Sequence, residues 1–114
     1  MNGLVQQGPL VLFAALAISH FLADFPLQGD FLALNKVRSN AAGVSEWIVS
    51  LCAHSAIQAG GVWIVTGSPV FAAVEFVLHG LIDLAKGERK FGLIPDQLLH
   101  LACKAGYVGA LVYG

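Results

Sequence analysis

The sequence predicts an all-α polytopic membrane protein, with four transmembrane helices plus a short interfacial helix after the first span, in a single domain at 1–114. Hydrophobic residues make up 57% of the chain and charged residues only 11%, whereas soluble domains carry about 25% charged residues. No Asp, Glu, Lys or Arg occurs at 1–23 or 47–74, and each stretch exceeds the about 20 residues that a spanning helix needs. The net charge of −1 predicts no nucleic-acid partner, because nucleic-acid-binding surfaces are strongly basic.

The first span is predicted at 9–25, where Pro26 ends the helix because proline lacks the amide hydrogen and clashes with the preceding turn. No Lys or Arg precedes residue 36, so the segment lacks the basic start of a secretory signal peptide and is expected to be retained. A short amphipathic helix lying in the membrane interface is predicted at 26–40, with Asp30 as its N-cap. Its apolar and basic residues are Phe31, Leu32, Leu34, Lys36 and Arg38.

Three further spans follow. The second is predicted at 44–66 and is ended by the turn sequence Gly67-Ser68-Pro69. The third begins at that proline and covers 69–86, since proline suits the first turn of a helix. The fourth is predicted at 95–113, beginning at Pro95 and interrupted by Lys104. The glycines at 60, 61, 106 and 109 would allow close helix packing within one subunit or in a homodimer.

The basic residues predict the orientation of these spans. Five of the six lie in the connections between the first and second spans and between the third and fourth, namely Lys36, Arg38, Lys86, Arg89 and Lys90. Basic loops stay in the cytoplasm, so these connections are predicted to be cytoplasmic and both termini to face outside. The predicted location is a bacterial cytoplasmic (inner) membrane, crossed by several spans.

Three of the four histidines have an aspartate four residues away, and all six residues lie in or at the end of apolar stretches. Residues four apart share one face of a helix, so each pair presents an imidazole beside a carboxylate. At about 1.5 Å per residue, the histidines lie roughly 8 to 15 Å from the cytoplasmic helix ends and form one layer. The pairs are His20 with Asp24, His79 with Asp83 and Asp96 with His100, and His54 lies alone in the second span.

The polar residues of the four spans must face one another, because hydrocarbon cannot solvate them. Imidazole and carboxylate groups on facing helices are typical of divalent-metal sites, so we predict a bound zinc ion, with iron, manganese or nickel as alternatives. The surplus over one tetrahedral ion indicates a two-metal site or carboxylates that orient the imidazoles. The predicted ligands are His20, Asp24, His54, His79, Asp83, Asp96 and His100. Cys52 and Cys103 are predicted to be buried hydrophobes, with Cys103 as a minor alternative ligand.

The same residues also have structural interpretations. Asp96 would be stabilised in the first turn of a helix by the helix dipole alone, and Asp83 could pair with Lys86 three residues on. The His–Asp pairs could hold helices together by hydrogen bonds, and Glu75 could pair with Lys104 across the bundle. A proton or ion path is a third interpretation of the same polar layer.

Several ordered motifs resemble one family over nearly the whole chain. They are His20-Phe-Leu-Ala-Asp24-Phe-Pro-Leu-Gln28, Asn35-Lys36, the lone His54, His79-Gly-Leu-Ile-Asp83-Leu-Ala-Lys86 and Asp96-Gln97-Leu-Leu-His100. These motifs resemble the domain-of-unknown-function 3307 family of small bacterial and phage membrane proteins, and that family implies no particular activity. In outline, the pattern is also similar to small bacterial inner-membrane proteins described as metal-dependent hydrolases, which favours the metal interpretation.

The residues and the resemblance together predict a membrane-embedded metal-dependent hydrolase whose His/Asp site opens to the cytoplasmic side. The predicted partners are membrane lipids and a lipid-like or membrane-associated substrate. Catalytic roles are predicted for Asp24, Asp83 and Asp96 as further ligands or general base, and for Lys104 as a stabiliser of developing negative charge. The alternatives are a non-catalytic, phage-type membrane interaction protein and a proton or metal transporter. The wholly apolar stretch at 10–18 argues against a transporter, because it offers no polar path.

Overall fold

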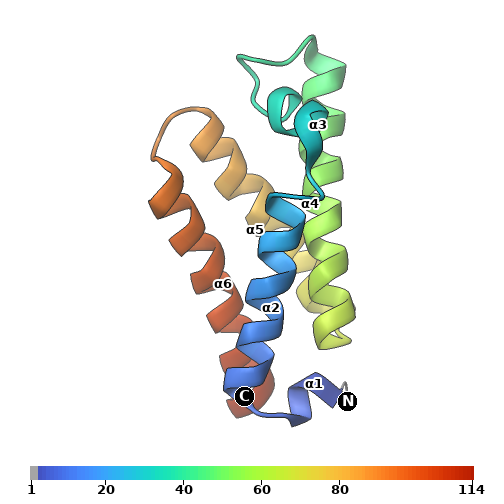
Figure 1. Cartoon of the computed structure of the whole chain (residues 1–114), viewed down its shortest axis with the longest axis vertical. Coiled ribbons are helices and arrows are strands. Elements are labelled where there is room, and N and C mark those ends of the chain that lie inside the picture. The colour runs from blue at the N-terminus through green and yellow to red at the C-terminus, as the bar shows by residue number, and fades with distance from the viewer. Residues whose placement is uncertain (1–2) are drawn as a thin grey trace.

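The computed structural model describes residues 3–114, and this part of the chain consists of helices, turns and loops without a β-strand (Figure 1). Its helices are α1 (Gly3–Gln6), α2 (Pro9–Asp24), α3 (Gly29–Asn35), α4 (Val44–Thr66), α5 (Pro69–Gly87) and α6 (Leu93–Tyr113). Helices α2 and α5 each pack against both α4 and α6, so the four long helices form a bundle. The two ends of the chain lie at one end of this bundle, and α3 lies toward the other (Figure 1).

The all-α prediction is confirmed, and each long helix starts and ends within two residues of its predicted range. Local chemistry explains these boundaries. Pro69 occupies the first turn of α5, and the Ser68 hydroxyl caps that helix by accepting a hydrogen bond from the Phe71 amide at 3.2 Å. Gly67 ends α4 in the left-handed region that favours glycine.

The helix after α2 is shorter than predicted. It covers Gly29–Asn35 in place of 26–40, and Asp30 lies inside its first turn while Gln28 is the N-cap. The reason is a turn that follows α2, closed by a hydrogen bond from the Leu27 amide to the Leu22 carbonyl at 3.0 Å. The chain needs this turn to change direction, because the axis of α3 lies at 86° to that of α2.

The buried side chain of Asn35 ends α3 and fixes the loop that follows. Its amide group donates to the Phe31 carbonyl at 3.0 Å, and its carbonyl oxygen accepts from the Ala42 amide at 3.0 Å. These two bonds tie the loop at 36–43 back onto α3, so the basic residues of that loop are held near the end of the bundle. If the helix continued to residue 40, the side chain of Asn35 could not reach the Ala42 amide.

By length and composition, one described helix meets the requirement for a membrane span where four were predicted. Helix α4 qualifies by itself, and α2 with α3 would qualify only as one span bent by 86°. Helix α2 has only 16 residues, or about 24 Å at 1.5 Å per residue. Helix α5 contains the charged residues Glu75, Asp83 and Lys86, which count against a span.

The bundle is more polar inside than outside. Among the described residues, fourteen polar or charged side chains are buried, against nine hydrophobic ones, while twenty-five large hydrophobic side chains are exposed. Leu10 is 82% exposed, Ile64 80% and Val70 69%. A soluble protein rarely buries Asp, Glu or Lys or exposes large contiguous apolar areas, so this surface needs an apolar partner.

Polar and apolar side chains occupy different halves of the interior. The apolar cluster contains Val5, Leu12, Leu16, Val62, Val65, Tyr107 and Val108, which come from α1, the start of α2 and the ends of α4 and α6. This half lies at the end of the bundle where the two chain ends lie (Figure 1). The His/Asp layer therefore lies in the half that is nearer to α3 and the basic loops.

The C-terminus of α5 carries one strained residue. The Lys90 amide donates to the Ala85 carbonyl at 3.0 Å and the Arg89 amide to the Lys86 carbonyl at 2.9 Å, which are the two bonds of a Schellman motif. Its left-handed position usually holds glycine, yet here it is Arg89 with a φ of 62°. A side chain in that conformation costs about 1 kcal/mol, so the chain keeps an arginine where glycine would fold more easily.

Candidate metal centre

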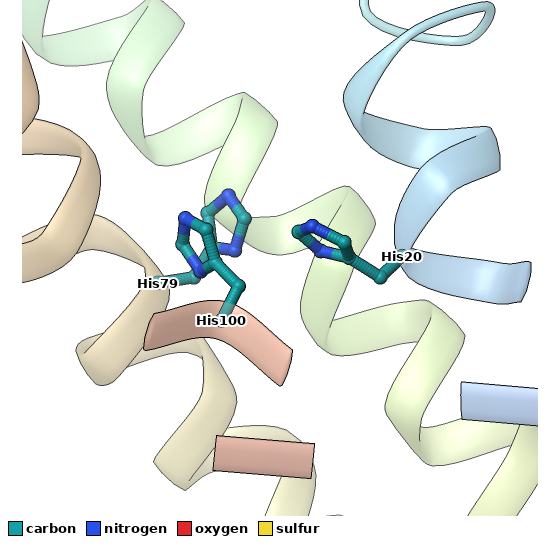
Figure 2. Close-up of side chains that lie close together, drawn as sticks. All are labelled: His20, His79 and His100. Atoms are coloured by element: carbon teal, nitrogen blue, oxygen red, sulfur yellow. The ribbon is translucent and has the colours of Figure 1, made fainter. Parts of the chain in front are cut away.

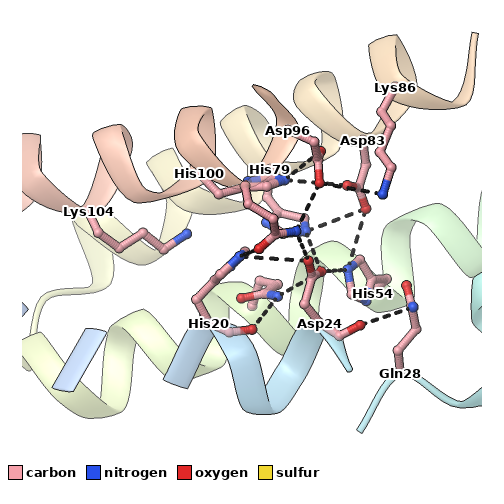
Figure 3. Close-up of polar contacts among 12 residues, drawn as sticks. His20, Asp24, Gln28, His54, His79, Asp83, Lys86, Asp96, His100 and Lys104 are labelled. Atoms are coloured by element: carbon pink, nitrogen blue, oxygen red, sulfur yellow. Dashed lines mark hydrogen bonds and ion pairs between the residues drawn. The ribbon is translucent and has the colours of Figure 1, made fainter. Parts of the chain in front are cut away.

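All seven predicted ligands are buried and come together in one layer between the four long helices (Figure 3). Each pair spans one helical turn, so each helix presents its imidazole and carboxylate on the inward face. Figure 2 shows that the imidazoles of His20, His79 and His100 point toward one another from three different helices. The rings of His79 and His100 stack, with centroids 4.0 Å apart and planes inclined by 24°.

Three overlapping groups in this layer have ligand atoms within 4.8 Å of one another. They are His20, His79 and His100; Asp24, His54, His79 and Asp83; and Asp83, Asp96 and His100. His79, Asp83 and His100 each belong to two groups, and Cys52 and Cys103 belong to none within the described residues. The minor expectation that Cys103 is a ligand therefore finds no support in the geometry. The prediction that both cysteines are buried is wrong, because Cys52 is exposed and Cys103 is half-buried.

The atoms around His79 and His100 are spaced as ligands of one ion are spaced. His79 Nε2 lies 3.5 Å from Asp83 Oδ2 and 3.7 Å from Asp24 Oδ1. His100 Nε2 lies 3.2 Å from Asp96 Oδ1 and 3.4 Å from Asp83 Oδ1. Ligands at about 2.0–2.2 Å from a tetrahedral ion are about 3.3 Å apart. Within residues 3–114 the Nε2 atoms of His79 and His100 have no hydrogen-bond partner, although buried polar atoms normally have one.

Asp83 presents its two oxygens to different sides of the layer. Oδ1 faces His100 at 3.4 Å, whereas Oδ2 faces His54 at 3.4 Å and His79 at 3.5 Å. Lys36 also donates to Oδ2 at 2.9 Å. A carboxylate shared in this way is the arrangement that bridges two ions in two-metal sites, so the donor set suits either one ion or two.

Glu75 fixes the orientation of His79. Its Oε2 accepts a hydrogen bond from His79 Nδ1 at 3.2 Å and from Lys104 Nζ at 2.7 Å, and its Oε1 accepts from the Tyr107 hydroxyl at 2.9 Å. Because the proton of His79 is on Nδ1, the Nε2 lone pair is free to bind an ion, as in carboxylate–histidine–metal triads. The predicted pairing of Glu75 with Lys104 is confirmed. The role of Lys104 in stabilising developing charge stays a prediction.

Gln97 is a central residue of the layer that the sequence analysis did not select. Its amide nitrogen donates to Asp24 Oδ2 at 2.8 Å and to Asp96 Oδ2 at 3.0 Å. Its oxygen therefore accepts from His20 Nε2 at 2.8 Å, which leaves His20 Nδ1 without a proton. The signals in the sequence were that Gln97 follows Asp96 in the first turn of its helix and belongs to the Asp96-Gln97-Leu-Leu-His100 motif.

Asp24 is the most heavily hydrogen-bonded carboxylate of the layer. Its Oδ1 accepts from His54 Nε2 at 2.9 Å and from Gln58 Nε2 at 3.3 Å, in addition to the Gln97 bond on Oδ2. The layer thus has two parts. The Nε2 atoms of His20 and His54 have hydrogen-bond partners and their Nδ1 atoms do not, whereas in His79 and His100 it is the Nε2 atoms, which lie beside Asp83, that have none among the described residues.

Lysines compensate most of the negative charge in this region. Lys36 pairs with Asp83 at 2.9 Å, and Lys86 lies 3.5 Å from Asp96, so the suggested pairing of Asp83 with Lys86 is not found. The four buried acids are Asp24, Glu75, Asp83 and Asp96, and the three lysines beside them are Lys36, Lys86 and Lys104. With neutral imidazoles the region carries one net negative charge, which a divalent ion would reverse.

Comparison with known proteins identifies the family. The family model described as "Protein of unknown function (DUF3307)" matches residues 12–107, which include every residue of the layer. No curated protein and no solved structure matches the chain.

Proposed function

We propose that this chain, which belongs to the DUF3307 family, is a membrane-embedded metal-dependent hydrolase acting on a lipid-like or membrane-associated substrate. One observation carries the proposal: the Nε2 atoms of His79 and His100 both lie at ligand spacing from Asp83, that of His100 also from Asp96, and neither has a hydrogen-bond partner among the described residues. Helices α5 and α6 provide these four residues, and Asp24 of α2 lies 3.7 Å from His79 Nε2. Zinc is the proposed ion, because imidazole and carboxylate ligands in a buried site suit it.

The apolar exterior supports a membrane location. Exposed residues such as Leu10, Ile64 and Val70 would contact lipid, and the buried ions would be shielded from it. We propose four spans with both termini outside, in the bacterial cytoplasmic membrane. The basic loops at 36–43 and 88–92 would then lie in the cytoplasm. The other end holds the apolar cluster, which argues against a path across the bundle and hence against a transporter.

Single cysteines introduced into a variant without Cys52 and Cys103 test this topology. Ser39 and Tyr113 are both exposed and lie at opposite ends of the bundle. With intact cells, a membrane-impermeant thiol reagent should label a cysteine at 113 and not one at 39. Labelling of both before permeabilisation, or of residue 39 alone, would contradict the proposed orientation.

Different residues of the chain can perform different parts of the hydrolysis. A divalent ion would supply Lewis acidity, polarising the scissile group and activating water. His79, His100 and Asp83 would hold it, with Glu75 orienting His79. We assign the general base to Asp96, because its Oδ1 has no hydrogen-bond partner among the described residues. Gln97 would keep Asp96 aligned through its bond to Oδ2.

An apolar groove beside the layer supports a lipid-like substrate. It lies between α2 and α4, has a volume of about 610 Å³, and is lined by residues such as Ile18, Leu22, Ala23 and Ile57. Ser19 and Ala23 in its wall each precede a layer residue of α2, His20 and Asp24, so the groove runs alongside the layer. Pockets of this size accommodate small ligands.

Metal content is the first test. Wild-type protein in phosphate-free maltoside micelles should contain about one or two equivalents of zinc or another transition metal, measured by inductively coupled plasma mass spectrometry. His79→Ala should lose the metal, whereas Ser55→Ala should keep it. Ser55 is an appropriate control because it is buried in α4 one residue from His54, and its hydroxyl has no partner within the described residues. A folded wild-type protein that contains no metal and cannot be reconstituted would contradict the proposal.

The hydrogen bonds of Asp24 favour one alternative, a non-catalytic membrane interaction protein in which the layer holds helices together. Its bonds connect α2 to α4 through His54 and to α6 through Gln97. Under this alternative His79→Ala would unfold the protein. Under our proposal the variant loses metal and remains helical, as circular dichroism would report.

A further inference from the structure

A second cavity lies beside the metal centre at the end of the bundle that carries the basic loops. Its volume is about 300 Å³, and its polar lining comprises Gln28, Lys36, Asp83, Lys86 and Arg89. The side chain of Asp83 is only 2% exposed, that of Lys36 is 13% exposed and that of Lys86 is 36% exposed. The cavity therefore leads from an accessible basic rim to the carboxylate that faces His79 and His100.

We propose that this cavity binds a phosphate group of the substrate, so that the hydrolase acts on a phosphate ester. The claim that a phosphate ester is hydrolysed rests on the proposed function. The claim that the cavity binds a phosphate group depends only on the residues that line the cavity. The lining contains three cations, Lys36, Lys86 and Arg89, and one carboxylate, that of Asp83, and a divalent ion behind Asp83 would add further positive charge. An anionic group is the complement of that field.

Arg89 is the residue that would bind the phosphate directly. Lys36 and Lys86 already neutralise Asp83 and Asp96, whereas Arg89 forms no ion pair with any residue in 3–114 and is exposed at the rim. A guanidinium group offers paired donors that match two phosphate oxygens. The free cation of the cavity is thus the one whose geometry suits phosphate.

The backbone of Arg89 shows that the chain keeps an arginine at a position that favours glycine. With a φ of 62°, this residue occupies the left-handed position of a Schellman motif, where glycine is preferred. Backbone strain of this kind is found at binding sites, where the side chain is needed for function.

Gln28 adds a hydrogen-bond acceptor to the cavity. Its amide nitrogen donates to the Asp24 carbonyl at 3.1 Å, but its buried Oε1 has no partner among the described residues. A protonated phosphate oxygen or a neighbouring hydroxyl of the substrate could donate to it. The cavity is too small for an acyl chain and a head group together, so a lipid phosphate would leave its chains outside.

The test compares Arg89→Gly with Arg38→Ala. Glycine removes the guanidinium and relieves the strained backbone, so this variant should unfold at the same or a higher temperature. Arg38 is a matched control, because it lies in the neighbouring loop and binds Glu88 at 2.9 Å outside the cavity. Arg89→Gln, which keeps a β-carbon, is the second variant.

Binding is measured by calorimetry in phosphate-free maltoside micelles, with inorganic phosphate as one probe and phosphatidic acid in mixed micelles as the other. Both Arg89 variants should bind phosphate at least about tenfold more weakly, while Arg38→Ala changes little. Binding of phosphatidic acid alone would identify a lipid phosphate, and binding of both probes a phosphate group in general. Equal affinity in wild type and both Arg89 variants would overturn the inference.

Metal content measured on the same samples separates the two proposals. Metal-loaded wild-type protein that binds neither probe refutes the phosphate site and leaves the metal centre intact. Metal-free wild-type protein that binds phosphate through Arg89 refutes the metal centre and keeps the anion site. Loss of phosphate binding with unchanged metal content in Arg89→Gly supports both.

Discussion

Replacing Glu75 with glutamine should weaken metal binding without unfolding the protein. Glu75 accepts a hydrogen bond from His79 Nδ1 and thereby directs the Nε2 lone pair toward the space between Asp83 and Asp24. Loss of such a carboxylate partner typically lowers metal affinity 10–100-fold, or about 1.4–2.7 kcal/mol. The bond is 3.2 Å long, longer than the about 2.7–2.9 Å of a strong charge-assisted bond, and Lys104 shares the same oxygen. We therefore expect the lower limit, about tenfold.

The assay is competition with a chromophoric chelator in maltoside micelles. A double variant, Glu75→Gln with Lys104→Met, is the necessary control, because the single change leaves a buried ammonium group with weaker compensation. The double variant removes both charges and should be as stable as wild type. It should still show the tenfold loss, because His79 no longer has its carboxylate partner.

Two results would refute the reasoning. Unchanged affinity in both variants would mean that Glu75 does not control His79. A loss in the single variant that the double variant restores would mean that the uncompensated Lys104, and not the orientation of His79, weakened the site.

Three further predictions follow from the same contacts. Lys104→Met alone should lower the free energy of unfolding by about 3–5 kcal/mol, because Glu75 is left charged and buried, and thermal unfolding of the double variant should recover most of it. Asn35→Ala should lower stability by about 1–3 kcal/mol through loss of the acceptor for the Ala42 amide, and hydrogen exchange at Ala42 should become faster. Chelator should lower the melting temperature of wild type by removing a ligand of the folded state and should leave that of His79→Ala unchanged; equal shifts would contradict a specific site.

The helices and the contents of the polar layer could be predicted from the sequence because both depend on local geometry. A spacing of four residues puts His79 and Asp83 on one face of α5 whatever surrounds that helix. Pro26, Pro69 and the glycine turns likewise act on their own neighbours. The one helix with wrong limits, α3, depends on Asn35 bonding across the loop to Ala42, which no local pattern reveals.

The partners across the bundle were decided by tertiary structure. Asp83 has Lys86 three residues away, yet it binds Lys36, and Lys86 lies beside Asp96. Gln97 follows Asp96 in the sequence, but only the structure shows that it contacts three charged or imidazole side chains from two helices. Such contacts depend on how far each helix is rotated about its axis and on the path of each loop, and a change of one residue in either would select a different partner.

The sequence by itself thus determined an all-helical chain whose apolar stretches contain regularly spaced imidazole and carboxylate groups, since hydrogen bonding within a helix fixes which residues share a face. Only the tertiary structure decided that the Nε2 atoms of His79 and His100 have no hydrogen-bond partner in the described chain while those of His20 and His54 do. It also put the strained Arg89 at the rim of the cavity above Asp83. The physical reason is that a distance between helices reflects the packing of all their side chains together, which is a property of the whole bundle.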